Sequence, residues 1–255
     1  MPADNRPIGV LDSGVGGISV LRKLVSLMPN ENFIYYGDSA NAPYGTRSTD
    51  EICTLTKATV DALCRMDCKC IVIACNTATT ACADILRQQY PDIPIIGIEP
   101  ALKPAALAHR GGRILVLATS VTLHEAKFNR LMAAYKDTAD ISTLACPGIV
   151  EYVERGITDG PELISYLQNL FSPYLSPAPD AVVLGCTHYP FVSHAIQAVL
   201  GSSCEIFDGA DGAARQTLNR LVKEGLTADS CAAGTVVFHN SLESDIPLSR
   251  RLFYM

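Results

Sequence analysis

The sequence predicts an α/β protein built from two similar domains. Short apolar runs of strand length alternate with amphipathic stretches along the whole chain, a pattern typical of parallel sheets covered by helices on both faces. The segments that end the strand-like runs also recur at a nearly constant offset, which indicates an internal duplication. Open α/β sheets bind ligands beyond the carboxyl ends of their strands, so we expect functional residues in these recurring segments.

Composition limits the class of protein. The chain has 255 residues, 48% of them hydrophobic, which is enough for one large or two moderate cores. With 26 acidic and 20 basic residues the surface repels polyanions, so we expect no nucleic-acid partner. The apolar runs stay below the roughly 20 residues of a membrane helix, and the first ten residues lack the apolar core of a secretory signal. We therefore expect a cytoplasmic protein without a membrane partner.

The ten cysteines fit the same compartment. A reducing environment keeps thiols free, so most of them are expected to be small buried hydrophobic residues. The cluster of Cys64, Cys68 and Cys70 lacks a second pair at zinc-site spacing, which disfavours a metal site.

Two helices between the strand-like runs have recognisable starts. In STDEICTLTKATVDALCRM, Ser48 and Glu51 form a capping box. A second helix is predicted to open with Thr122 and Glu125. Residues that share one face then follow at helical spacing: Ile52, Leu55, Thr59, Leu63 and Met66 in the first helix, and Phe128, Leu131, Met132 and Tyr135 in the second.

The duplication rests on four pairs of strand ends that align in order. The offsets of 106, 108, 111 and 109 residues relate Ile8 to Ile114, Tyr36 to Leu144, Cys75 to Cys186, and Glu99 to Asp208.

Each half places a cysteine directly after a buried strand, in VIACNTAT and in VVLGCTHYP. If the two halves face each other, Cys75 and Cys186 point into one cleft. A thiolate on one side of a carbon acid and a thiol on the other can invert the carbon, and they exchange roles in the reverse reaction. The pKa of free cysteine is about 8.5, so both protonation states are accessible near neutral pH.

Polar residues beside the two cysteines suit this chemistry. Asp12, where a strand meets the following helix, can hold a substrate ammonium or orient Cys75, and His188 can assist Cys186. Removing the α-proton of an amino acid also requires desolvation and a stabilised carbanion. Short side chains that can bind a carboxylate near helix N-termini follow the same strands: Ser13, Asn76, Thr77 and Thr187.

Each of these residues also has a structural interpretation. Asp12 and Ser13 can cap a helix, His188 can be a satisfied structural histidine, and a single cysteine is more often a packed thiol than a catalytic one. The repeated placement of two cysteines favours catalysis over packing. Cys146 ends another predicted strand and is a rival, weakened by the following Pro147 and by the absence of a polar neighbour.

A dinucleotide site is the strongest competing motif. Glycines at 14, 16 and 17 stand between a strand and a helix, and Asp38 ends the next strand where a ribose-binding acid would lie. Against this interpretation, Ser19 occupies the third glycine position, and Asp12 would place a negative charge beside the pyrophosphate. A nucleotide-dependent oxidoreductase is therefore the less favoured class.

The segments IGVLDSGVGGISVL, YYGDSANAPYGTRS, IVIACNTATT, IIGIEPALKPA and VVLGCTHYP occur in this order over nearly the whole chain. Their combination resembles the glutamate racemases of the aspartate/glutamate racemase family. The resemblance implies a cofactor-independent isomerase, without pyridoxal phosphate or metal, that converts L-glutamate to D-glutamate. It also implies that the product supplies peptidoglycan synthesis and so maintains cell shape.

The resemblance assigns roles to individual positions. Cys75 and Cys186 match the catalytic thiols of the family, and Glu154 matches its acidic residue near the site. Glu151 stands where the family commonly has proline, and Asp38 falls on a family carboxylate of undefined role. The substrate-contacting pairs of the family match Asp12-Ser13, Tyr44-Gly45, Asn76-Thr77 and Thr187-His188.

The resemblance further implies two α/β domains with the active site between them. The chain is expected to cross back, so that residues 1–97 with 207–255 form one domain and residues 98–206 form the other. Homodimers are common in the family, and we expect one here. Two alternatives stay open: a racemase of a related acid such as aspartate, and a non-catalytic two-lobed protein that binds a small acid.

Overall fold

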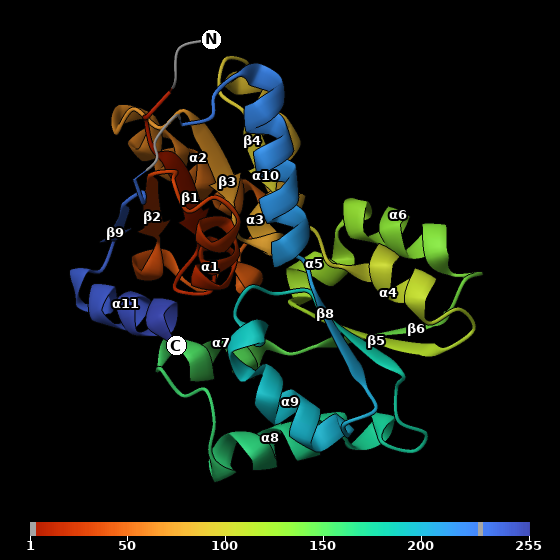
Figure 1. Cartoon of the computed structure of the whole chain (residues 1–255). Helices are drawn as coiled ribbons and strands as arrows, with labels where there is room; N and C mark the ends of the chain where they lie inside the picture. Colours follow the sequence, from red (N-terminus) through yellow and green to blue (C-terminus); the bar gives the residue numbers. More distant parts are fainter. Residues whose placement is uncertain (1–3, 229–231) are drawn as a thin grey trace. The chain divides into compact units, whose positions relative to one another are not determined.

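The architecture comes from a computed structural model, which describes residues 4–228 and 232–255 (Figure 1). The chain divides into two compact units, the first formed by Met1–Glu99 with Ala210–Met255 and the second by Pro100–Gly209. The C-terminal segment thus belongs to the same unit as the N-terminal strands.

The first unit contains a parallel sheet in the order β4-β3-β1-β2-β9. Its central strands β1 and β3 are buried along their whole length, as expected for strands covered on both faces. Helices α2 and α3 pack together, and α1 packs against α10 and α11. The strands are β1 (Ile8–Asp12), β2 (Phe33–Gly37), β3 (Cys70–Ile73), β4 (Ile95–Gly97) and β9 (Val236–Asn240). The helices are α1 (Ile18–Leu27), α2 (Thr49–Arg65), α3 (Asn76–Gln89), α10 (Ala210–Glu224) and α11 (Ile246–Tyr254).

The second unit contains a parallel sheet in the order β6-β5-β7-β8. Here α4 packs against α6, and α8 packs against α9. The strands are β5 (Arg113–Ala118), β6 (Asp140–Ala145), β7 (Ala181–Leu184) and β8 (Glu205–Asp208). The helices are α4 (Leu102–Ala108), α5 (Ser120–His124), α6 (Ala126–Tyr135), α7 (Pro147–Glu154), α8 (Pro161–Phe171) and α9 (Ser193–Leu200).

The two sheets repeat the same strand order. Pairing the strands by the sequence offsets relates β1 to β5, β2 to β6, β3 to β7 and β4 to β8, and the order β4-β3-β1-β2 then becomes β8-β7-β5-β6. The strand β9 extends the first sheet only. The predicted fold class of two similar parallel-sheet α/β domains is confirmed.

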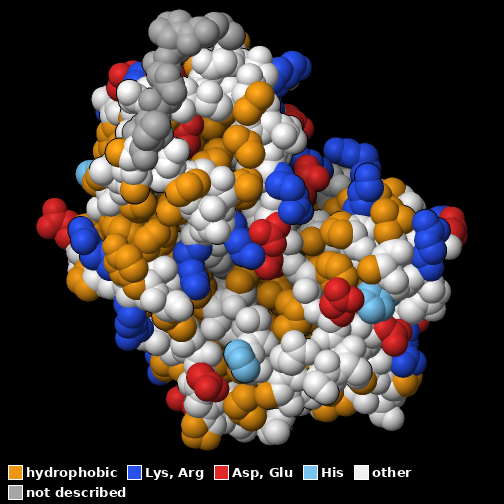
Figure 2. All heavy atoms as spheres, viewed as in Figure 1, with side chains coloured by type: hydrophobic (Ala, Val, Ile, Leu, Met, Phe, Trp, Pro, Cys, Tyr) orange, Lys and Arg blue, Asp and Glu red, His pale blue; other side chains and the backbone are white. Residues whose placement is uncertain are grey.

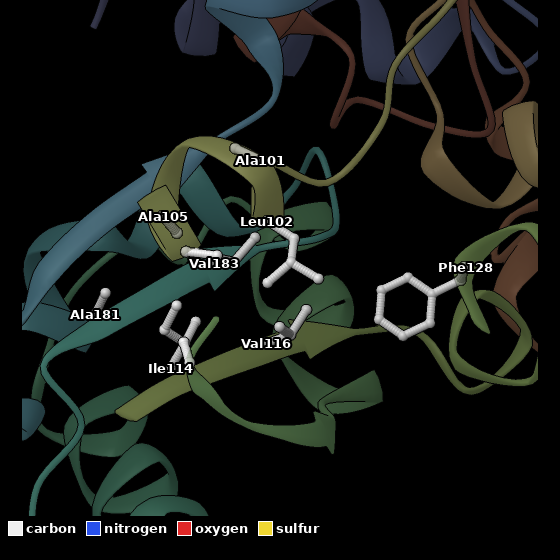
Figure 3. Close-up of a cluster of buried hydrophobic side chains, with 10 residues drawn as sticks. Ala101, Leu102, Ala105, Ile114, Val116, Phe128, Ala181 and Val183 are labelled. Atoms are coloured by element: carbon white, nitrogen blue, oxygen red, sulfur yellow. The ribbon is translucent and has the colours of Figure 1, made fainter. Parts of the chain in front are cut away.

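One cluster of the second unit shows how a helix covers a sheet. Val116 of β5 and Val183 of β7 are paired in register and lie in one cluster with Leu102 of α4 (Figure 3). All three side chains are fully buried. Phe128 of α6 closes one end of the cluster, and the other predicted face residues of that helix pack against it half-buried: Leu131, Met132 and Tyr135.

The two predicted helix starts have different outcomes. The capping box of α2 is confirmed, because Ser48 Oγ accepts from the Glu51 N–H (3.4 Å) and Glu51 Oε2 accepts from the Ser48 N–H (3.0 Å). The second start is wrong in detail. Thr119, at the end of β5, caps α5 by accepting from the Thr122 N–H, and Glu125 is extended and separates α5 from α6.

A buried ion pair stabilises the amino end of the first sheet. Lys69 Nζ lies 2.6 Å from Glu31 Oε2, and both side chains are almost fully buried. The ammonium also donates to the backbone oxygen of Asp4, and Glu31 Oε1 accepts from the N–H of Ala228 (2.8 Å). The ion pair thus links the start of β3 and the segment that leads into β1 to the segment that follows α10.

Charged side chains of both signs are interspersed on the face of the molecule seen in Figure 2. Among the described residues, none of the helices has both the length and the apolar character that a transmembrane segment needs.

Gly17 is required where α1 approaches the end of β1. A Cβ at this position would lie 2.7 Å from Asp12 Cβ and 3.0 Å from Ala74 Cβ. We expect Gly17→Ala to lower the free energy of unfolding in urea by about 1–3 kcal/mol because of this overpacking. The matched control is Gly212→Ala in α10, where an added Cβ meets no atom within 4 Å and stability should stay equal or rise by up to about 1 kcal/mol. Equal effects of the two changes would contradict the packing argument.

Candidate functional site

Asp12 ends β1 and organises the turn that follows it. Its Oδ1 accepts from the N–H of Gly14 (2.9 Å), and the hydroxyl of Tyr35 donates to the Gly14 oxygen (2.7 Å). The N-cap of α1 is Gly17, which uses no side-chain capping bond. Asp12 is therefore a buried carboxylate at a strand end, and helix capping does not account for it.

Cys75 lies at the junction of β3 and α3. It is the N-cap of α3, and its Sγ accepts from the N–H of Ala78 (3.5 Å). The same sulfur lies 3.7 Å from Oγ of Ser13, which places the ends of β1 and β3 side by side. An N–H donor and a helix N-terminus both stabilise negative charge on a sulfur. The position suits a thiol that must alternate with a thiolate.

The neighbouring Asn76 has a buried amide without a partner. Its side chain is 4% exposed, and among the described residues neither Oδ1 nor Nδ2 has a hydrogen-bond partner. Leaving such a group unpaired costs about 1–3 kcal/mol. A donor and an acceptor held ready beside a cysteine indicate a place for a polar ligand. Thr77, the next residue, is also buried there.

Asp38 is used within the protein itself. Its Oδ2 accepts from the Tyr44 hydroxyl (2.7 Å), and both of its oxygens accept from Asn41 Nδ2 (3.0 and 3.1 Å). Burial, followed by the hydrogen bond to Asp38, raises the pKa of Tyr44, so this hydroxyl keeps its proton. The carboxylate therefore holds the short helical turn Tyr44–Thr46, which includes the half-buried Gly45. This use of Asp38 removes the main acidic residue on which the dinucleotide interpretation depended.

In the second unit, three side chains form a chain of contacts. Cys186 follows β7, and its Sγ lies 3.6 Å from His188 Nδ1. On the other side of the ring, His188 Nε2 lies 2.6 Å from Oε1 of Glu154, the last residue of α7. His188 is almost fully buried, as is Thr187 between it and the cysteine. Glu151 is exposed on the same helix and takes no part in this chain.

The neighbours of His188 favour its positively charged form. Burial lowers its pKa, but the hydrogen bonds to Cys186 and Glu154 outweigh burial and raise the pKa well above its usual value. The imidazolium can then donate toward Cys186 and toward Glu154 at once. A cation beside Cys186 supports negative charge on its sulfur.

We expect Glu154→Gln to lower the pKa of His188, because one of the two interactions that favour the imidazolium is lost. A raised folded-state pKa stabilises the fold fully below the unfolded value of about 6.5, and this contribution disappears as pH rises through the folded-state pKa. The stability deficit of the variant should therefore shrink toward alkaline pH. NMR titration of the His188 ring is the measurement, with the exposed His194 as internal control. An unchanged His188 titration would disprove this role of Glu154.

The rival cysteine behaves as a packed thiol. Cys146 is fully buried at the end of β6, and its Sγ donates to the backbone oxygen of Leu144 (3.5 Å). Burial, and then the proximity of Cys186, raise its pKa to about 12. Its backbone oxygen accepts from the hydroxyl of the buried Tyr189 (2.9 Å). Through this hydrogen bond the backbone of Cys146 holds the segment that follows Cys186. The Cys146 thiol stays protonated near neutral pH.

Thr119 was missed as a candidate in the sequence. It lies at the end of β5, which corresponds to β1 in the repeat, and its hydroxyl contacts that of Thr122 at 3.0 Å. The offset of 106 residues placed it opposite Ser13. This correspondence could have identified Thr119 from the sequence, because it places a hydroxyl at the strand end equivalent to that of Ser13.

The other described cysteines are not grouped in a way that could hold a metal ion. Within residues 4–228 and 232–255 no group of three or more metal-ligating side chains is placed to share an ion. Burial raises the pKa of several thiols far from neutrality: Cys68 and Cys82 to about 12, and Cys204 to about 11. These thiols are protonated near neutral pH, and Cys68 and Cys204 pack as small hydrophobic groups.

Comparison with known proteins gives a consistent result. The model of the Asp/Glu/Hydantoin racemase family matches residues 8–217. A glutamate racemase of Clostridium novyi is 49% identical over 255 residues, which cover 99% of this chain and 98% of that protein.

Solved structures agree with the sequence relatives. The glutamate racemase of Escherichia coli, solved with L-glutamate and the activator UDP-MurNAc-ala, matches with a TM-score of 0.85 and 31% identity over 97% of this chain and 95% of that chain. The glutamate racemase of Francisella tularensis, solved with D-glutamate, matches with a TM-score of 0.85 and 27% identity over 99% of this chain and 95% of that chain.

Proposed function

This chain belongs to the Asp/Glu/Hydantoin racemase family, and on that premise we propose that it interconverts L-glutamate and D-glutamate without a cofactor. The resemblance seen in the sequence motifs is thereby confirmed at the level of the family. Relatives solved with L-glutamate and with D-glutamate support glutamate as the substrate. The observation that carries the proposal is the equivalent placement of Cys75 and Cys186 after corresponding strands, each with its own charge-stabilising neighbours.

In the proposed reaction the two cysteines act on opposite sides of the α-carbon of one bound glutamate. A thiolate removes the α-proton, and the opposite thiol donates a proton to the other face of the carbanion. Inversion in the reverse direction exchanges the two roles. The Cys186–His188–Glu154 chain supports the sulfur of one half, and the α3 N-terminus supports the sulfur of the other.

The remaining polar groups are proposed to bind the substrate. Asp12 can accept from the ammonium group. The unpartnered amide of Asn76 can both donate to and accept from the ligand. The other residues of the proposed binding set are Ser13, Tyr44, Gly45, Thr77, Thr187 and His188.

The cellular role proposed for the product follows from the family. D-glutamate would enter peptidoglycan synthesis and so maintain cell shape, in the cytoplasm and with the enzyme as a homodimer. Neither nucleic acid nor a membrane is part of this proposal.

Incubation with L-glutamate in deuterated water, without added cofactor, tests the function. We expect deuterium at the α-carbon together with product of the opposite configuration, detected by NMR and chiral chromatography. A parallel incubation with L-aspartate distinguishes the related racemase. Binding without exchange would favour a small-acid-binding protein, and a requirement for nicotinamide would favour the oxidoreductase; either result would overturn the proposal.

A further inference from the structure

Two cysteines outside the proposed site meet where α2 packs against α3. Cys53, in the first turns of α2, donates from its Sγ to the backbone oxygen of Ala81 at 3.5 Å. Cys82, the next residue of α3, points toward α2. Cys53 and Thr56, which lie one turn apart on α2, are side-chain neighbours of its thiol and influence its pKa. The two sulfurs therefore face each other across the helix interface.

We propose that Cys53 and Cys82 form a modification site, a dithiol that a peroxide oxidises to a reversible disulfide between α2 and α3. Cys53 is half-buried, whereas Cys82 is 2% exposed, so the oxidant meets Cys53 first. The cross-link would join two helices that are more than twenty residues apart in the chain yet already packed together.

The chemistry proceeds in two balanced steps. The O–O bond of hydrogen peroxide breaks as Cys53 Sγ takes one oxygen and becomes a sulfenic acid, and the other oxygen leaves as water. Cys82 Sγ then gives up its proton as it attacks the sulfur of Cys53, the S–O bond breaks, and the hydroxyl leaves with that proton as a second water. Both sulfurs are oxidised and the peroxide is reduced to two water molecules. A thiol reductant reverses the change by exchange.

A short path of hydrogen bonds connects this site with Cys75. Cys82 Sγ donates to the backbone oxygen of Ala78 (3.1 Å), and the N–H of Ala78 donates to Cys75 Sγ (3.5 Å). Oxidation removes the S–H of Cys82 and with it the bond to Ala78. The modification therefore changes the first turn of the helix that positions the proposed catalytic thiol.

Peptide mapping of the intact protein tests the inference. The protein is treated with hydrogen peroxide, its free thiols are alkylated, and proteolytic peptides are analysed by mass spectrometry. We expect a linked pair of peptides that contains Cys53 and Cys82, lighter than their sum by two hydrogens, that disappears with dithiothreitol. This readout does not depend on racemase activity, so it distinguishes failure of this inference from failure of the proposed function.

The variants sharpen the test. Cys53→Ser should lose the linked peptide, whereas Cys64→Ser, a change to another half-buried cysteine of α2, should retain it. Cys82→Ser provides a second loss variant on the partner helix. The inference fails if the wild-type Cys53 and Cys82 are recovered alkylated or as separate sulfinic acids under conditions that oxidise other cysteines. It fails equally if Cys82 is linked to a different cysteine.

Discussion

Replacing either Cys75 or Cys186 by alanine is expected to reduce the rate of glutamate racemization by about 10² to 10⁴-fold, the usual contribution of one acid–base group. Each variant would lack one of the two proposed proton-transferring groups, so inversion would have no donor or acceptor on one face of the α-carbon. Both sulfurs lie at the carboxyl ends of strands that are held by buried neighbours. Deletion of one sulfur should therefore leave the fold intact.

The measurement is the turnover of each enantiomer, followed by circular dichroism at fixed substrate concentration. Cys204→Ala is the matched control, because Cys204 is equally buried in the second unit but lies before β8, at the amino end of the sheet. The control should keep its turnover. If Cys75→Ala or Cys186→Ala retained most of the wild-type rate in a folded protein, the two-base mechanism would be excluded.

Lys69→Met is expected to lower the free energy of unfolding by about 3–5 kcal/mol, because it leaves Glu31 charged and unpaired in a buried position. Lys69 also holds the backbone oxygen of Asp4, so the segment that leads into β1 loses an anchor. Urea unfolding followed by far-UV circular dichroism gives the midpoint and slope. The change should shift the midpoint strongly.

An exposed ion pair provides the comparison. Lys23 lies 3.2 Å from Asp211, and both side chains are about half exposed. Because solvent screens such pairs, Lys23→Met should change stability by less than about 1 kcal/mol. Equal destabilisation by Lys23→Met and Lys69→Met would show that burial of the ion pair is not the source of its effect.

Much of the fold could be predicted because its signals are local. The buried strands before Cys75 and Cys186 are continuous apolar runs, and the capping box at Ser48 and Glu51 is complete within four residues. The duplication was visible because corresponding strands end at similar offsets. Each of these features depends on short-range sequence pattern, which is retained when the chain folds.

The parts that escaped prediction depend on which groups the folded backbone brings within hydrogen-bond distance, whether the residues are near or far apart in the chain. The start of α5 is set by Thr119, which becomes a cap only because β5 delivers its hydroxyl to the first turn. The function of Asp38 is defined by its hydrogen bonds to Asn41 and Tyr44. The meeting of Cys53 with Cys82 requires two helices to pack, and no pattern in either helix specifies the facing residue.

The two units share one strand order but surround their cysteines differently. In one unit the sulfur caps a helix, and in the other it contacts an imidazole that is hydrogen-bonded to a carboxylate. Mirror-image substrates have equal free energies in water, so the Haldane relation requires equal kcat/KM for both directions. If the different surroundings of the two cysteines make the two directions unequal, the difference must appear as compensating changes in kcat and KM. The two enantiomers should consequently saturate the enzyme at different concentrations, although neither is favoured at equilibrium.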